Sequence, residues 1–86
     1  MIRTKMVVVK SYVPKEGASK SEIWLCDILN KSGMNLRQLG DGCHISKQQI
    51  SNLVNGKSTL SFPMICAICY ATGLDDPEEV WNALSL

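Results

Sequence analysis

Side chains with strong hydrogen-bonding groups are concentrated in a short stretch near the middle of the chain. They are Lys47, Gln48, Ser51 and Asn52. On a helix, Lys47 lies beside Ser51 and Gln48 beside Asn52, because residues four apart share one side. Amide side chains pair bidentately with adenine, and a lysine donates to guanine. We interpret the stretch as a surface for the edges of nucleic-acid bases, against the alternative of an ordinary polar helix face in contact with water.

Two short helices joined by a turn are predicted to position these side chains. Apolar residues recur at helical spacing on both sides of the turn: Leu36, Leu39, Ile45, Ile50, Leu53 and Val54. The first helix is expected to end at about Gly42, because Gly40, Asp41 and Gly42 favour a bend. The second is expected over residues 47–55, with Ser46 as its N-cap. This pattern predicts a helix-turn-helix with an exposed polar face on the second helix.

The segment resembles the helix-turn-helix of the Cro/cI family of phage and bacterial repressors, also called the Xre family. The matching positions are Leu39, Gly40, Ile45, Ser46, Ile50, Ser51, Asn55 and Gly56, and the likeness covers roughly residues 19–84. It implies an all-α fold, a five-helix lambda-repressor-like DNA-binding domain over residues 19–86. His44 stands at the turn position where the family usually has glycine, and a positive φ there is costly for other residues.

The resemblance also implies which side chains contact DNA. Those expected to read bases are Lys47, Gln48, Ser51 and Asn52. Those expected to contact the DNA backbone are Arg37, Gln38, Ser46, Gln49, Asn55, Lys57 and Ser58. At the start of the first helix, free amides and the positive end of the helix dipole favour a phosphate on physical grounds as well. For Arg37, the role of a solvated surface charge stays equally open.

Charge is distributed unevenly along the 86 residues. All nine Lys and Arg residues lie within residues 1–60, together with four acidic residues, whereas residues 61–86 carry four acidic residues and no basic one. Such a chain can present its basic part to phosphates and keep its acidic end away. No apolar run approaches the roughly 20 residues of a membrane helix, and residues 6–9 are too short a run for a signal peptide. We expect a cytoplasmic protein with no membrane partner.

Four cysteines raise the question of a metal or a disulfide. Cys66 and Cys69 have the spacing of metal ligands, and Cys43 precedes the single histidine, His44. However, Cys66 and Cys69 fall inside an apolar helical run, where a reduced cysteine behaves as a small hydrophobe. A disulfide framework, which would include Cys26, belongs to secreted proteins. We expect core thiols, with no metal and no cofactor.

Residues 1–18 are predicted to form an N-terminal arm. Its first 13 residues have the composition of a strand and include Val7, Val8 and Val9. A strand needs a partner for its backbone groups, and no second strand is evident in the sequence. We expect it to pair with the same strand of a second subunit, and the alternative is a basic tail.

The first of three further helices is predicted over residues 20–31. Ser19 and Glu22 have the spacing of a capping box, and Gly33 follows the expected end. Its apolar residues are too many for one narrow stripe, so we expect packing on more than one side. Trp24 is expected in the core or at an interface.

The last two helices are predicted to follow Ser61 and Asp76. Ser61 is expected to cap a helix that is apolar nearly all round, and therefore buried, and that ends at Gly73. The second has Asp76 as its cap and Pro77 at its first position. One side of it is lined by Val80, Trp81 and Leu84. This side either covers the core or forms a dimer seam. In a dimer, the two recognition helices would have to read half-sites about 34 Å apart on DNA.

No arrangement of residues suggests an enzyme. The sequence lacks a Ser-His-acid set, paired carboxylates and a glycine-rich phosphate loop after a strand. We expect a small phage- or prophage-type regulator that binds an operator in double-stranded DNA as a homodimer. Two alternatives share its fold: an antitoxin that also neutralises a toxin, and a protein-interaction module that has lost DNA binding.

Overall fold

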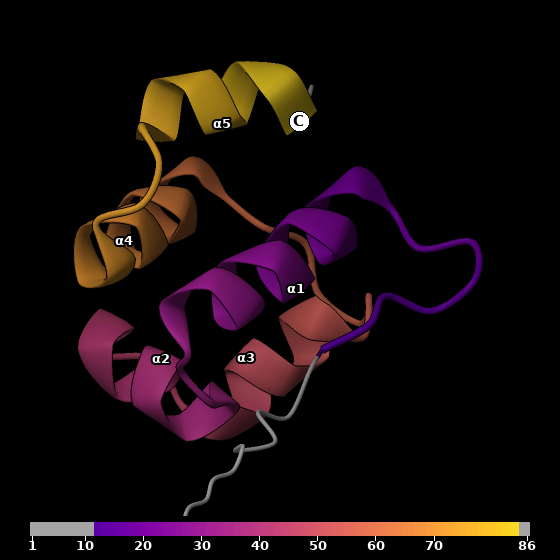
Figure 1. The fold of residues 1–86 in the computed structure, drawn as a ribbon, viewed down its shortest axis with the longest axis horizontal. Helices are drawn as coiled ribbons and strands as arrows, with labels where there is room; N and C mark the ends of the chain where they lie inside the picture. Colours follow the sequence, from indigo (N-terminus) through magenta and orange to yellow (C-terminus); the bar gives the residue numbers. More distant parts are fainter. Residues whose placement is uncertain (1–11, 85–86) are drawn as a thin grey trace, which may run out of the picture.

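The computed structural model describes residues 12–84, which contain five helices and no strand. The helices are α1 (Lys20–Ser32), α2 (Leu36–Cys43), α3 (Lys47–Val54), α4 (Phe62–Thr72) and α5 (Pro77–Leu84) (Figure 1). The expected all-α, five-helix fold is thereby confirmed. Most of the expected N-terminal strand, including Val7, Val8 and Val9, lies outside the described residues.

Tyr12 and Val13, which were expected to extend that strand, are not in a strand. Tyr12 is fastened to α1 instead: its N–H donates to Oδ1 of Asn30 at 2.8 Å, and its carbonyl accepts from Nδ2 of Asn30 at 2.9 Å. The side-chain amide thus satisfies the backbone groups that a neighbouring strand would otherwise satisfy. Because Tyr12 also packs against the core, it belongs structurally with the helices.

Local capping determines where several helices begin and end. The expected capping box of α1 is confirmed: the hydroxyl of Ser19 accepts from the N–H of Glu22, and the Glu22 carboxylate accepts from the N–H of Ser19 at 3.1 Å. Gly33 ends α1 in the left-handed conformation, with φ of 72°. Asp76 caps α5 by accepting from the N–H of Glu79 at 3.2 Å.

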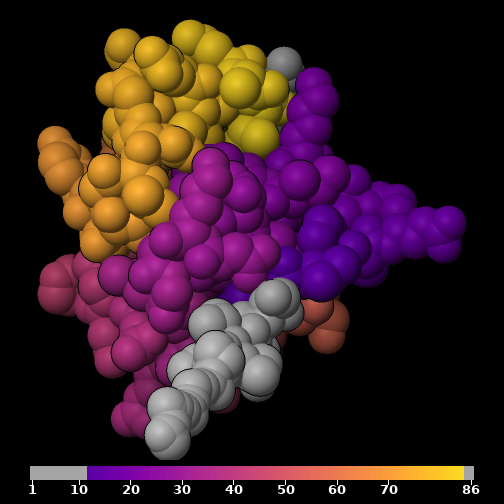
Figure 2. Space-filling view, viewed as in Figure 1, coloured from indigo at the N-terminus to yellow at the C-terminus, as the bar shows by residue number. Residues whose placement is uncertain are grey.

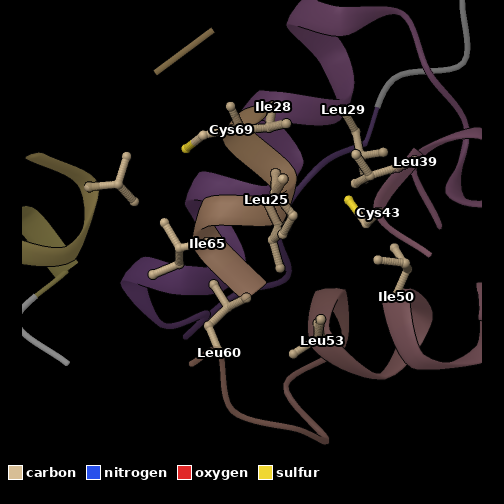
Figure 3. Close-up of a cluster of buried hydrophobic side chains, with 12 residues drawn as sticks. Leu25, Ile28, Leu29, Leu39, Cys43, Ile50, Leu53, Leu60, Ile65 and Cys69 are labelled. Atoms are coloured by element: carbon tan, nitrogen blue, oxygen red, sulfur yellow. The ribbon is translucent and has the colours of Figure 1, made fainter. Parts of the chain in front are cut away.

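Eight fully buried aliphatic side chains form the centre of the core (Figure 3). They are Leu25, Ile28 and Leu29 of α1, Leu39 of α2, Ile50 and Leu53 of α3, and Ile65 and Ile68 of α4. Burying such a side chain fully contributes roughly 1.5–3 kcal/mol. Every helix of the helix-turn-helix therefore has at least one anchor in a core shared with α1 and α4.

Helix α4 is less buried than its apolar sequence suggests. Only three of its residues are fully buried: Ile65, Ile68 and Cys69. Tyr70 is 87% exposed, so the expectation of burial all round is wrong. An all-apolar sequence has no periodicity to identify the open side, and α4 packs mainly against α2 and α5. Ser61 occupies the N-cap position of α4, but its side chain makes no capping hydrogen bond.

The turn between α2 and α3 falls at His44, the expected turn position, but Gly40 and Gly42 do not bend the chain before it. Gly40 and Gly42 are inside α2, and the chain turns at His44, which has φ of 60° and ψ of 37°. Gly40 serves packing rather than bending, because a Cβ there would lie 2.5 Å from the carbonyl oxygen of Ile45. The N–H of Ile45 donates to the carbonyl of Gly40 at 2.8 Å, so the two segments touch backbone to backbone.

The helix-turn-helix and the acidic end of the chain lie apart. In Figure 1, α2 and α3 are at the opposite end of the molecule from α5, with α1 and α4 between them. The space-filling view shows α5 covering the far end (Figure 2). The acidic residues Asp75, Asp76, Glu78 and Glu79 belong to α5 and the segment before it. Among the described residues, the acidic segment around α5 is thus separated in space from the helix-turn-helix.

Candidate nucleic-acid interface

Helix α3 has one side in the core and the other open. Ile50 is fully buried and Leu53 is 2% exposed, and both point into the cluster of Figure 3. The side chains expected to read bases lie on the open side: Lys47 and Gln48 are exposed, and Ser51 and Asn52 are half-buried. The structure therefore brings all four together on one helix face, where a polar partner can reach them.

The two amides on this face contact each other. Nε2 of Gln48 donates to Oδ1 of Asn52 at 3.1 Å, as expected for residues one helical turn apart. Gln48 keeps its own carbonyl oxygen and one N–H, whereas Asn52 keeps both N–H groups of its amide. The contact thus restricts both side chains and makes their remaining hydrogen-bonding groups different.

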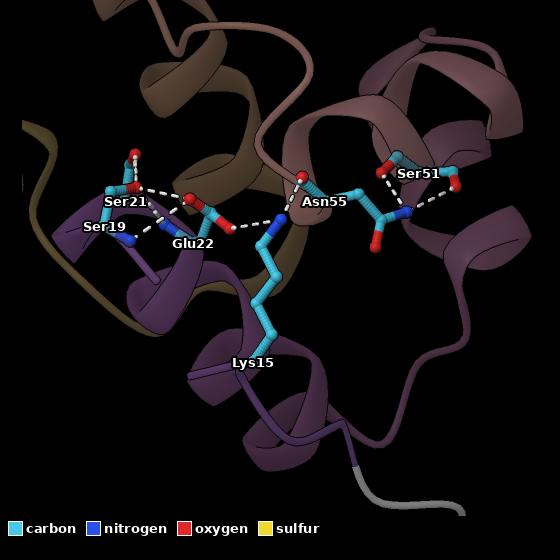
Figure 4. Close-up of polar contacts among 6 residues, drawn as sticks. All are labelled: Lys15, Ser19, Ser21, Glu22, Ser51 and Asn55. Carbon is cyan, nitrogen blue, oxygen red and sulfur yellow. Dashed lines mark hydrogen bonds and ion pairs between the residues drawn. The ribbon is translucent and has the colours of Figure 1, made fainter. Parts of the chain in front are cut away.

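The side chain of Asn55, the C-cap residue of α3, folds back and hydrogen-bonds to the last turn of the helix. Its Nδ2 donates to the carbonyl of Ser51 at 2.9 Å and to the Ser51 hydroxyl at 3.2 Å (Figure 4). The hydroxyl of Ser51 can still donate a hydrogen bond outward. Beyond the helix, Asn52 accepts at its carbonyl from the N–H groups of Lys57 at 2.8 Å and Ser58 at 3.3 Å. The exposed Lys57 is therefore held close to the end of α3.

The end of α3 is also held by contacts that sequence reasoning missed. Nζ of Lys15 donates to the carbonyl of Asn55 at 3.0 Å and lies 4.0 Å from Oε2 of Glu22 (Figure 4). A Cβ on Gly56, where φ is 77°, would lie 2.8–3.0 Å from the Glu22 carboxylate. The carboxylate of α1 thus packs directly on the turn after α3. No local pattern in the sequence indicates this, since Lys15 and Asn55 are 40 residues apart.

Glu22 is kept ionised by its hydrogen bonds. The N–H and the hydroxyl of Ser19 donate to its Oε1, and these bonds, helped by the charge of Lys15, lower the pKa of the carboxyl despite its burial. Oε2 is buried and accepts no hydrogen bond. The ammonium of Lys15 therefore balances two negative groups: the carboxylate of Glu22 and the negative end of the α3 dipole.

At the start of α2, a second capping box involves Asn35 and Gln38. Oδ1 of Asn35 accepts from the N–H of Gln38 at 2.8 Å, and Oε1 of Gln38 accepts from the N–H of Asn35 at 2.9 Å. The side-chain oxygen of Gln38 thus serves the helix, and its NH2 group is the part that can reach a phosphate. Arg37, beside it, is exposed. The Asn-x-x-Gln spacing is a local signal that could have predicted this cap.

The remaining residues expected at the DNA backbone surround the start of α3. The hydroxyl of Ser46 accepts from the N–H of Gln49 at 3.1 Å, which confirms Ser46 as the N-cap. Ser46 is exposed, and Gln49 and Ser58 are half-buried. Their contacts with DNA stay predictions.

The cysteines lie in or at the edge of the core. Cys26, Cys43 and Cys69 are buried and Cys66 is half-buried. Burial raises the pKa of Cys26 and Cys43, and with nearby negative charge it raises the pKa of Cys69 to about 11. Within residues 12–84, no three His, Cys, Asp or Glu residues come together as metal ligands would.

The residues expected at a dimer seam differ in exposure. Val80 is 6% exposed and packs into the core of its own chain, so it has little surface left for a partner. Trp81 and Leu84 are half-buried. Trp81 contacts Phe62 of α4 edge to face, with ring centroids 5.5 Å apart. Trp24 lies at the edge of the core, where its indole N–H donates to Asp75 at 2.9 Å.

Comparison with known proteins agrees with this geometry. A family model described as helix-turn-helix matches residues 27–78, which is more than half of the chain and includes α2, α3 and α4. Searches of curated proteins and of solved structures gave no match. None of the helices described here is both long enough and apolar enough to cross a bilayer.

Proposed function

Because the chain belongs to the Cro/cI-type helix-turn-helix family of DNA-binding proteins, we propose that it is a sequence-specific regulator that reads double-stranded DNA. In this proposal α3 enters the major groove, which is wide enough for one helix. The single observation that carries it is the two-sided character of α3. Ile50 and Leu53 hold one side in the core, and the opposite side presents amide, hydroxyl and ammonium groups.

Gln48, Ser51 and Asn52 face the base edges from the middle of α3, and Lys47 enters at its N-terminal end. Each well-placed bidentate contact discriminates against a wrong base by about 1–3 kcal/mol. The side chains around this face contact the sugar-phosphate backbone: Arg37, Gln38, Ser46, Gln49, Asn55, Lys57 and Ser58. The acidic residues near α5 lie at the other end of the molecule, so they do not oppose the approach of phosphates.

We further propose that the regulator is a phage- or prophage-type repressor that binds as a homodimer. Two recognition helices must then lie about 34 Å apart to read successive half-sites. Among the described residues of α5, we expect Trp81 and Leu84 to contact the second subunit. Val80 is buried in the core of its own chain and has little surface left for a partner. Val7, Val8 and Val9 remain the alternative contact, through the N-terminal arm.

Sedimentation of a chain lacking residues 1–11 separates these two dimer surfaces. This deletion keeps Tyr12, which is bonded to Asn30 of α1. If the arm forms the dimer, the shortened protein sediments as a monomer. If α5 forms it, the shortened protein stays dimeric, and Trp81→Arg produces the monomer.

Selection from a random pool of duplexes with the purified protein tests the regulator directly. We expect an enriched, two-fold symmetric site with half-sites one DNA turn apart. Affinity for this site should fall as salt rises, because the protein displaces counterions from phosphates. A pool without enrichment, combined with no salt-dependent binding of any duplex, would overturn the proposal and favour a protein-interaction module.

A further inference from the structure

A chain of polar contacts joins the start of α1 to the open side of α3 (Figure 4). The hydroxyl of Ser19 donates to Oε1 of Glu22 at 2.9 Å, and Oε2 of Glu22 lies 4.0 Å from Nζ of Lys15. The same Nζ donates to the carbonyl of Asn55 at 3.0 Å, and the amide of Asn55 donates to the hydroxyl of Ser51 at 3.2 Å. The chain therefore ends at one of the side chains expected to read bases.

Lys15 is the link in this chain between the segment before α1 and the end of α3. Asn55 is the C-cap residue of α3, and carbonyls at the end of a helix lack a donor within that helix. The ammonium of Lys15 supplies this donor at the negative end of the helix dipole. It therefore fixes the backbone at the point where the Asn55 side chain turns back toward α3.

The amide of Asn55 is used within its own helix. Nδ2 donates to the carbonyl of Ser51 at 2.9 Å and to the Ser51 hydroxyl at 3.2 Å, so the NH2 group already has two acceptors. A hydroxyl that accepts from one side directs its own O–H elsewhere, and few directions are open to the half-buried Ser51. The position of Asn55 thus influences the direction in which the Ser51 hydroxyl donates.

The carboxylate of Glu22 depends on Lys15 for its counter-charge. The Glu22 side chain is 10% exposed, and its Oε2 accepts no hydrogen bond. The carboxylate also packs on Gly56, where an added Cβ would lie 2.8–3.0 Å from it. A buried charge without a partner is strongly unfavourable, so loss of the ammonium would favour movement of the carboxylate away from this turn. The end of α3 would then lose two supports together.

We propose that Lys15 is a positioning residue for base recognition: it holds the end of α3 so that Asn55 aims the hydroxyl of Ser51 at one base. This inference rests on the proposed function. Lys15 itself makes no contact with DNA, and its charge neutralises no phosphate. Asn55 acts on Ser51 rather than on the DNA backbone, because the NH2 group of its amide is already engaged.

The experiment measures base preference and salt dependence separately. The duplex is the site selected for the wild-type protein, and Ser51→Ala first identifies the base pair whose preference depends on the hydroxyl. The test variants are Lys15→Gln and Asn55→Ala, and Lys15→Arg keeps a cation that can donate to the same carbonyl. The matched control is Lys31→Gln, which breaks the ion pair of 3.0 Å with Asp27 on the surface of α1. Circular dichroism confirms that each variant is folded.

Lys15→Gln and Asn55→Ala should both lower the preference at that base pair by roughly fivefold, as expected for one misdirected hydrogen bond. The preference at the base facing Gln48 and the salt slope should keep their wild-type values, since no phosphate contact is lost. Combining Lys15→Gln with Ser51→Ala should lower the preference no further than Ser51→Ala alone, because Lys15 acts through that hydroxyl. Lys15→Arg and Lys31→Gln should behave as the wild type.

Other results would overturn the positioning role. A salt slope lower by about one in Lys15→Gln, with equal weakening of all duplexes, would make Lys15 a phosphate contact. Additive losses in the double variant, an unchanged preference in Lys15→Gln, or no effect of Ser51→Ala would each remove the link between the two residues. A loss of preference at every base pair would mean that α3 is loosened as a whole.

In all of these cases the wild-type protein still binds DNA, so the proposed function would survive. Absence of duplex binding by the wild type would instead reject the function, and the role of Lys15 with it.

Discussion

Gln48 and Asn52 are joined on the open side of α3 by a hydrogen bond of 3.1 Å from Nε2 of Gln48 to Oδ1 of Asn52. The bond leaves Gln48 with one acceptor and one donor, which is the pair that matches N6 and N7 of adenine. It leaves Asn52 with both N–H donors and only one lone pair of Oδ1, so Asn52 faces outward mainly as a donor, which matches the acceptors O6 and N7 of guanine or O4 of thymine. Two similar side chains are thereby given different preferences before DNA is present.

Asn52→Asp tests this difference. A carboxylate at position 52 still accepts from Gln48 but turns from a donor into an acceptor toward DNA. We expect weaker binding to all duplexes and a change of preference toward cytosine, whose N4 donates, at the base facing residue 52. The preference at the base facing Gln48 should stay. Competition among duplexes with each base at the two positions measures this.

Asn52→Ala is the matched control, since it removes the amide without adding a charge. The assignment of donors and acceptors is wrong if Asn52→Asp and Asn52→Ala show the same base preferences. It is also wrong if both variants change the base preference at the position facing Gln48.

Stability should depend on Glu22 at acidic pH. Hydrogen bonds from Ser19 and the charge of Lys15 lower the pKa of Glu22 in the folded protein, relative to about 4.3 in the unfolded chain. Its contribution to the free energy of unfolding is therefore complete above the unfolded pKa and is lost as the pH falls through the lower folded pKa. Urea unfolding followed by tryptophan fluorescence from pH 7 to pH 2.5 measures it.

Glu22→Gln keeps an acceptor for Ser19 and cannot titrate. The difference in stability between the wild type and this variant should shrink as the pH falls below about 4.3. Parallel curves for the two proteins over the whole range would rule out a special role for Glu22.

Replacing His44 by glycine should stabilise the fold. His44 has φ of 60°, a conformation that costs a residue with a Cβ roughly 1–2 kcal/mol. Greater freedom of glycine in the unfolded chain offsets about 0.4–1 kcal/mol of this. Thermal unfolding should show a melting temperature a few degrees higher for His44→Gly, since ~1 kcal/mol corresponds to about 4–8 °C at this size. A lower melting temperature would show that the His44 side chain makes a stabilising contact.

Gly40→Ala should be destabilising, although alanine favours helices. The added Cβ would lie 2.5 Å from the carbonyl oxygen of Ile45, and a backbone atom cannot move aside as a flexible side chain can. We expect a loss of about 1–3 kcal/mol in the free energy of unfolding, measured with urea. Asp41→Ala, at an exposed neighbouring position of α2, should change it by no more than ~0.5 kcal/mol. Equal stability of Gly40→Ala and the wild type would contradict the close contact.

The elements that could be predicted from the sequence depend on local signals. Ser19 with Glu22 and Ser46 before α3 are caps whose partners lie three residues away. Ile50 and Leu53 have the spacing of a buried helix side, so the orientation of α3 followed from the sequence as well. Asn35 with Gln38 carries a similar local signal, since these two residues form the capping box of α2.

The features that could not be predicted depend on distant segments. The contacts of Lys15 with Asn55, of Glu22 with Gly56 and of Tyr12 with Asn30 join residues 18–40 positions apart. Glycine in α2 was interpreted as a helix breaker, because its close contact with the next segment is visible only in three dimensions.

The central claim is that the open side of α3 reads base sequence while the surrounding side chains hold the backbone. Comparing Gln48→Ala with Lys57→Ala on matched and mismatched operators tests it most directly. We predict that Gln48→Ala lowers discrimination by about 1–3 kcal/mol, and that Lys57→Ala weakens all duplexes alike and reduces the salt slope by about one. Equal losses for both variants on matched and mismatched duplexes would contradict this division of roles.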